Sequence, residues 1–223
     1  MSDKVKEGII KKINEVSPLL ISIAKEIHKR PELAFEENFA SGLLTAFLKK
    51  HGFKIEKGIA GLKTAFCASY SKGSSPVIGF IAEYDALPEV GHGCGHNLIG
   101  PASIGAAIAL AKSGLKGNIV VIGTPAEEKG GGKVILSKKG AFNNLDAAMM
   151  VHPSNDTEIV KRALAAIDVA VEYFGKPSHA AATPWDGANA LDAIILAFNN
   201  INALRQQLKP DVRIHGIITN GGA

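Results

Sequence analysis

The sequence has 223 residues, of which 46% are hydrophobic and 21% are charged. This balance is typical of a soluble globular protein with a sizeable core and one or two domains. The net charge is only +4, and the lysines and arginines are scattered, without a long basic run or interleaved aromatic residues. Composition therefore argues against a nucleic-acid partner.

The N-terminal segment and the cysteines indicate the compartment. The first residues lead into an amphipathic helix rather than the apolar core of a signal peptide, and no apolar run is long enough to span a bilayer. The two cysteines, Cys67 and Cys94, make no disulfide framework. Cys67, in a predicted strand, is expected to be a small buried hydrophobe. We predict a cytoplasmic protein without membrane contact, in which reducing conditions keep Cys94 available as a ligand.

The N-terminal third is predicted to be mostly helical. Apolar residues recur at helical spacing over residues 3–29, with an interruption at Ser17-Pro18, where Pro18 is expected to begin a second helix. A further helix is predicted over 36–51 because its apolar residues fall on one face. Short strands are expected near 53–55 and 64–70.

Three apolar runs predict the central strands of a sheet: 77–82, 118–123 and 147–151. A helix over residues 98–113 separates the first two, and a short helix through Leu136 separates the last two. Strands that alternate with helices in this way favour a parallel sheet with right-handed crossovers. The predicted fold class is α/β, with a mainly parallel sheet and flanking helices.

A different pattern begins after residue 160. Alternating apolar and polar residues over 167–173 predict a strand with one solvent-facing side, followed by a helix over 188–208 and a strand over 213–219. We therefore divide the chain into an α/β domain, 1–160, and the first part of an α+β domain, 161–223.

Polar residues follow the ends of the three central strands. Asp85 comes after the first strand, Glu127 and Glu128 after the second, and His152 after the third. The glycine-rich loop after Asp85 carries Cys94 and His96, and its glycines let the backbone approach a ligand closely. Because open α/β sheets bind ligands at the carboxyl ends of their strands, these side chains are expected to converge.

The converging side chains are of the types that hold transition metals. Thiolate, imidazole and carboxylate groups are credible metal ligands, and we assign this role to four residues: Cys94, His96, Glu128 and His152. A hydrolytic site also needs a carboxylate that takes a proton from water, and Glu127 is the candidate. Asp85 is the candidate for a carboxylate that orients a ligating histidine.

Each assignment has a simpler alternative. Paired glutamates in a loop are usually solvated surface charge, and a lone His152 after a strand is more often a core histidine. For Asp85 the alternatives are a helix cap or a turn former. Their position after buried strands favours function. The loop glycines do not fit the dinucleotide-binding pattern, and the sequence contains neither a P-loop nor a serine nucleophile elbow, which argues against nucleotide binding and serine hydrolysis.

Five segments resemble, in the right order, motifs of the M20 metallopeptidase family: Glu83–Pro88, Gly91–Leu98, Gly123–Glu128, Met150–Pro153 and Gly175–Ala180. The match is best to its amidohydrolase branch, which includes aminoacylase-like dipeptidases and aminobenzoyl-glutamate hydrolases, and it covers essentially the whole chain. The resemblance implies a zinc-peptidase-like catalytic domain over 1–160, followed by the start of a lid and dimerisation domain over 161–223.

The resemblance also implies roles for individual residues. Cys94, His96, Glu128 and His152 match the family's metal ligands and Glu127 its general base, in a site for two divalent ions, with zinc or manganese expected. His179 matches a lid histidine that stabilises the oxyanion in the active site of the neighbouring subunit, which implies a homodimer through the lid. The alternative for His179 is a loop histidine that caps a turn.

Two departures from the family pattern refine the expectation. Asn97 and Ile99 replace an aspartate and a histidine of many relatives, which points to the dipeptidase-like subgroup. The chain stops at Ala223, before the distal histidine that supplies the last metal ligand in the family, so it resembles a truncated member.

The principal functional hypothesis is hydrolysis of the amide bond in a small-molecule N-acyl amino acid or dipeptide-like substrate. In this hypothesis Glu127 activates a metal-bound water. The alternatives are a truncated noncatalytic module for metal binding or dimerisation, and a single structural metal.

Overall fold

The computed structural model describes residues 3–159 and 164–222, and the chain divides into two compact units, Met1–Thr157 and Glu158–Ala223. The predicted domain boundary between residues 160 and 161 lies outside the described residues. Among the helices that are described, none has the length and apolar character needed to cross a membrane.

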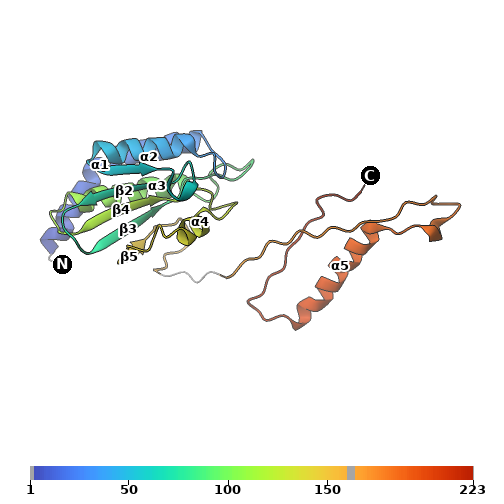
Figure 1. Ribbon diagram of the computed structural model, residues 1–223. Coiled ribbons are helices and arrows are strands. Elements are labelled where there is room, and N and C mark those ends of the chain that lie inside the picture. Colours follow the sequence, from blue (N-terminus) through green and yellow to red (C-terminus); the bar gives the residue numbers. More distant parts are fainter. Residues whose placement is uncertain (1–2, 160–163, 223) are drawn as a thin grey trace. The chain divides into compact units, whose positions relative to one another are not determined.

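The first unit is built on a five-stranded sheet with the order β1-β2-β4-β3-β5 (Figure 1). The strands are β1 (Lys54–Lys57), β2 (Phe66–Ser71), β3 (Val77–Ala82), β4 (Asn118–Gly123) and β5 (Ala147–Met149). The three predicted central strands, β3, β4 and β5, are parallel, while β1 and β2 extend the sheet in antiparallel pairing. The α/β prediction is therefore confirmed, although β5 ends two residues earlier than predicted.

Helices cover the two faces of the sheet unequally (Figure 1). Three of them lie on one face: α1 (Asp3–Lys29), α2 (Asn38–Lys50) and α3 (His96–Ala111). The short α4 (Gly132–Lys138) and the 3₁₀ turn η1 (Ile59–Gly61) pack on the other. The alternation of side chains along β3 explains this, because Phe80 joins the core under the three helices whereas Ile81 packs with Leu136 of α4.

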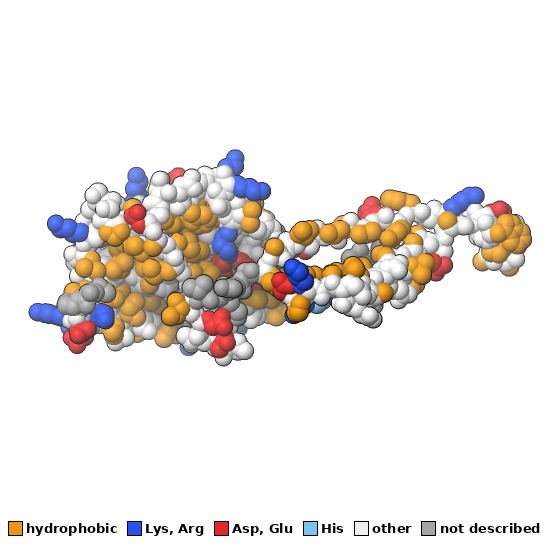
Figure 2. All heavy atoms as spheres, turned by 90° about the horizontal axis from the view of Figure 1, so that it is seen from below, with side chains coloured by type: hydrophobic (Ala, Val, Ile, Leu, Met, Phe, Trp, Pro, Cys, Tyr) orange, Lys and Arg blue, Asp and Glu red, His pale blue; other side chains and the backbone are white. Residues whose placement is uncertain are grey.

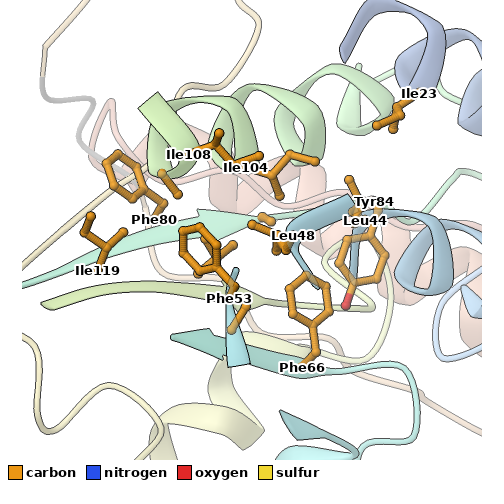
Figure 3. Packing of buried hydrophobic residues seen from close by; sticks show 14 of the residues in the cluster. Ile23, Leu44, Leu48, Phe53, Phe66, Phe80, Tyr84, Ile104, Ile108 and Ile119 are labelled. Atoms are coloured by element: carbon orange, nitrogen blue, oxygen red, sulfur yellow. The ribbon is translucent and has the colours of Figure 1, made fainter. Parts of the chain in front are cut away.

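The larger core lies between the sheet and the three helices (Figure 3). Leu44 and Leu48 of α2 and Ile104 of α3 are fully buried in it, next to Phe66 of β2. Each such side chain contributes roughly 1.5–3 kcal/mol by leaving water. This core fixes the ends of β3 and β4 relative to the start of α3.

The first helix runs without a break from Asp3 to Lys29, so the prediction of a second helix beginning at Pro18 is wrong. The proline removes one backbone hydrogen bond. Apolar residues on both sides of it nevertheless pack into the core, with Val16 before and Ile23 after. Burial of one continuous stripe outweighs the lost bond.

A carboxylate from the preceding loop caps α2. Glu32 accepts hydrogen bonds from the backbone N–H groups of Phe39 and Ala40, at 2.8 and 2.9 Å. These two groups have no partner within the helix, because they belong to its first turn. Glu32 therefore caps the N-terminus of α2. Glu37 occupies the N-cap position of this helix, but its side chain makes no capping hydrogen bond.

Replacing Glu32 with alanine is expected to destabilise the first unit by about 1–2 kcal/mol, because it leaves two helix N–H groups without their partner. A urea titration followed by far-ultraviolet circular dichroism measures the change. Glu36→Ala is the matched control, since that glutamate is exposed in the same loop and its effect should stay within about 0.5 kcal/mol. Equal effects of both substitutions would contradict the capping role.

The second unit contains α5 (Ala190–Leu204), flanked by the 3₁₀ turns η2 (Pro184–Asp186) and η3 (Arg205–Gln207). Asn189 caps α5, because its side chain accepts from the N–H groups of Leu191 and Asp192. The helix predicted over 188–208 is thus present, but its last turn, Arg205–Gln207, is a 3₁₀ turn.

The strands predicted over 167–173 and 213–219 are not formed in the described part of this unit. Both segments are extended but lack strand partners, and their apolar side chains are exposed: Val169 is 75% exposed and Ile217 is 82% exposed. Figure 2 accordingly shows many hydrophobic side chains on the surface of the second unit. A strand needs a neighbouring strand to pair with its backbone N–H and C=O groups. Alternation of apolar and polar residues predicts a strand but does not show whether such a neighbour exists.

Candidate metal centre

The strand register places residues from three strands at one level of the sheet. Ala82 of β3 pairs with Gly123 of β4, and Phe80 of β3 pairs with Met149 of β5. The next residues along β3 and β4 are Glu83 and Thr124, and His152 stands as far beyond Met149 as Glu83 does beyond Phe80. The carboxyl ends of the parallel strands therefore deliver their polar residues to the same edge.

His96 occupies the centre of this edge. It is the first residue of α3, follows Gly95 in the left-handed conformation at φ 78°, and is only 1% exposed. Its Nδ1 lies 2.9 Å from Oδ1 of Asp85. Because the carboxylate accepts, Nδ1 carries the proton and the lone pair of Nε2 points to the other side.

The charge around His96 changes its pKa. Burial lowers the pKa of the imidazole, but the hydrogen bond to Asp85 and the charges of Glu83, Asp85 and Glu128 together raise it above its ordinary value. The site thus collects negative charge around one buried ring. That is the electrostatic environment that attracts a cation.

Asp85 joins His96 to the loop that carries the glutamate pair. Its Oδ2 accepts a hydrogen bond of 3.0 Å from the backbone N–H of Glu128, while Oδ1 holds His96. Burial raises the pKa of this carboxyl, but the two donors outweigh burial and leave it lowered. Asp85 is therefore an anionic brace between the start of α3 and the loop after β4.

The two adjacent glutamates differ in exposure. The side chain of Glu128 is 17% exposed and its Oε1 lies 3.6 Å from Nε2 of His96, whereas Glu127 is 39% exposed with its Oε2 at 4.0 Å. The loop reverses direction at Ala126, which has a positive φ of 57°. One carboxylate thus lies inside the cluster and the other borders solvent.

Cys94 reaches the same cluster through Glu128. Its interaction with the Glu128 carboxylate, together with burial and the charges of Glu127 and Asp85, raises the pKa of the thiol to about 11. His152 lies beside His96, with the two rings edge to face at 5.7 Å between centroids. Its Nδ1 lies 2.8 Å from the carbonyl oxygen of Pro153, which can only accept, so Nε2 is its free lone pair.

Three buried ligand atoms at this edge have no hydrogen-bond partner among the described residues: Oε2 of Glu83, Nε2 of His96 and Oε1 of Glu128. Leaving such atoms unpaired is costly. Two overlapping groups have ligand atoms that all lie within 4.8 Å of one another: Glu83 with His96 and His152, and His96 with Glu127 and Glu128. Nitrogen and oxygen donors in this arrangement fit divalent transition-metal ions.

Sequence reasoning missed three residues of this region. Glu83 follows β3 directly and is 1% exposed, and Lys133 at the start of α4 forms an ion pair with its Oε1. Glu37, at the start of α2, accepts a 2.8 Å hydrogen bond from the backbone N–H of Ala126. The position of Glu83 at a strand end was a usable signal, but the other two contacts depend on the path of the loops.

His179 belongs to the second unit. Its Nδ1 accepts from the backbone N–H groups of Ala181 and Ala182, at 3.3 and 3.1 Å, so it caps a turn. An accepting Nδ1 places the ring proton on Nε2. The imidazole is therefore a hydrogen-bond donor at its outer nitrogen.

The carboxyl edge of the parallel strands thus gathers imidazole, thiol and carboxylate groups, which are the side chains that hold transition-metal ions. Residues 79–213 match the model of peptidase family M20/M25/M40. The chain belongs to this family, which confirms the resemblance seen in its motifs.

Two curated relatives illustrate the similarity in sequence. The chain is 44% identical over 239 residues to Xaa-Arg dipeptidase of Mus musculus, covering 98% of the chain and 54% of the relative. It is 36% identical over 222 residues to one of the subunits of p-aminobenzoyl-glutamate hydrolase from Escherichia coli (strain K12), covering 90% of the chain and 46% of the relative. The chain thus spans about half the length of these curated relatives.

A solved structure illustrates the similarity in fold. It is a dinuclear metal-binding peptidase of the M20 family from Bacillus subtilis. It shares 28% sequence identity with the chain and superposes with a TM-score of 0.54, covering 60% of this chain and 42% of that one. The similarity includes the α/β architecture described above.

Proposed function

We propose that this chain carries the principal metal-binding and proton-transfer residues of an amidohydrolase that cleaves dipeptide-like or N-acyl amino acid substrates. The observation that carries the proposal is the set of three buried, unpartnered atoms on Glu83, His96 and Glu128. A purely structural cluster would be expected to pair these atoms with protein donors. The relatives named above indicate the kind of substrate.

The residues proposed to hold two divalent ions are Cys94, His96, Glu128 and His152, at the carboxyl edge of the sheet. Such ions polarise the amide carbonyl and make water a stronger nucleophile at neutral pH. Asp85 would keep the His96 ring in its orientation, because it holds Nδ1 and leaves Nε2 toward the cluster.

Glu127 is the proposed general base. It borders solvent yet lies within 4.0 Å of His96, so a water molecule can reach its carboxylate beside the cluster. Glu127 would take the proton of the attacking water and return it to the leaving amine. His179, with its proton on Nε2, is proposed to donate to the oxyanion in the active site of a second copy of the chain.

The experiment is a substrate screen at rising metal concentration. The protein, stripped with a chelator and then titrated with Zn²⁺ or Mn²⁺, is incubated with dipeptides that end in arginine, p-aminobenzoyl-glutamate and N-acetylated amino acids. We expect the rate of amine release to rise with added metal and to level off near two metal ions per chain. Elemental analysis measures the bound metal. The same assay is applied to any longer protein encoded by the same reading frame. Tight metal binding without hydrolysis in both proteins would instead indicate a noncatalytic metal-binding module.

A further inference from the structure

Glu83 is a buried carboxylate of the cluster, only 1% exposed, and its two oxygens have different surroundings. Oε1 is paired with Lys133, whereas Oε2 has no hydrogen-bond partner among the described residues and lies 3.4 Å from Nε2 of His96. Since the His96 proton is on Nδ1, the two facing atoms are both electron-pair donors. Two lone pairs at this distance repel unless a proton or a metal ion lies between them.

The position of Glu83 is set by the sheet and not by a loop. It follows Ala82, the last residue of β3, and stands level with His152 when the β3–β5 register is continued. The ligand atoms of Glu83, His96 and His152 lie within 4.8 Å of one another. An ion at this place would therefore meet one carboxylate and two imidazoles.

Lys133 provides the balancing charge. It lies at the start of α4, its side chain is 35% exposed, and it contacts only Oε1 of Glu83 among the described ion pairs. A buried carboxylate without such a partner would carry a large desolvation cost. If the pair served stability alone, however, the second oxygen would be expected to find a donor as well.

We propose that Glu83 is a further ligand of the ion held by His96 and His152, and that Lys133 holds its carboxylate in place before the ion arrives. This inference rests on the proposed metal-dependent function and adds to it a ligand that the motif comparison does not assign. The predicted ligand set at this ion is one oxygen from Glu83 and one nitrogen from each histidine.

Two substitutions with opposite expected effects test the inference. Glu83→Gln keeps the shape of the side chain but removes its charge, and Lys133→Met removes the balancing charge but keeps Glu83. Each protein is stripped of metal, titrated with Zn²⁺ by calorimetry and loaded with Co²⁺ for absorption spectroscopy. Thermal unfolding is recorded with and without Zn²⁺, and Lys129→Met, at an exposed lysine in the loop just before α4, is the control.

We expect Glu83→Gln to weaken the binding of one ion by at least about tenfold and to change the Co²⁺ spectrum. Lys133→Met should lower the Tm of the metal-free protein relative to wild type. With Zn²⁺ added, its Tm should equal that of the wild type, because the ion then neutralises Glu83. Lys129→Met should match the wild type in every measurement.

Unchanged Zn²⁺ affinity and an unchanged Co²⁺ spectrum in Glu83→Gln would overturn the inference and leave Glu83 as the structural partner of Lys133. The proposed function would survive that result, because the wild type would still bind its ions. If the wild-type protein binds no divalent ion, the proposed function fails and this inference fails with it. The two failures are therefore distinguishable.

Discussion

Replacing Glu127 with glutamine is expected to lower kcat for amide hydrolysis by about 10³-fold, near the middle of the range for loss of a general acid–base group. Glutamine has nearly the same shape but cannot accept the proton of the attacking water. The side chain of Glu127 is the more exposed of the pair, and only its Oε2 approaches His96, at 4.0 Å. Metal content should therefore stay at the wild-type value while kcat falls.

Glu128→Gln is the matched comparison one residue away. Its carboxylate lies inside the cluster and has an unpartnered oxygen, so its loss should lower metal affinity before it affects the chemical step. Steady-state kinetics at saturating metal, together with metal content after dialysis, separates the two roles. If Glu127→Gln loses metal as readily as Glu128→Gln, Glu127 is a ligand and the assignment as base is wrong.

The parts of the fold that could be predicted were those determined by local sequence. The strand over 118–123 was predicted with the bounds it has, because an apolar run with a glycine at its end has few alternatives. The expected break at Pro18 was wrong because packing on both sides of the proline, invisible in a local pattern, carries the helix through. The strands expected over 167–173 and 213–219 failed for the related reason that strands need partners.

The same distinction applies to the candidate site. Parallel strands end at one edge, so the convergence of Asp85, the glutamate pair and His152 followed from the order of elements alone. The pairing of Lys133 with Glu83 did not, because it depends on how the glycine-rich loop before α4 turns. Contacts between residues 50 positions apart leave no periodic trace in a single sequence.

The largest effect on stability is expected at Glu37, which ties three segments together. This carboxylate is fully buried and accepts from the N–H groups of Phe35 and Ala126 and from the hydroxyl of Thr64. Glu37→Ala should cost roughly 2–4 kcal/mol, because it leaves buried donors without an acceptor. It should also weaken metal binding, since Ala126 precedes both glutamates of the cluster. Urea unfolding followed by circular dichroism measures the first effect, and Zn²⁺ calorimetry the second.

Glu37→Gln separates the charge of Glu37 from its hydrogen bonds. Burial raises the pKa of the carboxyl above its ordinary value of 4.5, although its three hydrogen bonds oppose the shift. A raised carboxyl pKa contributes stability that is fully present below the unfolded pKa and is lost as pH rises through the folded pKa. Glutamine keeps an acceptor for the two N–H groups and does not ionise. The stability of Glu37→Gln relative to wild type should therefore improve as pH rises above about 4.5 and then level off.

Urea titrations of both proteins at a series of pH values measure this difference in the free energy of unfolding. A difference that is independent of pH between about 3 and 8 would mean that the carboxyl of Glu37 has the same pKa in the folded and unfolded chains. In that case the hydrogen bonds from Phe35, Thr64 and Ala126 fully offset the cost of burying the charge, and Glu37→Gln differs from wild type only through contacts that do not depend on ionisation.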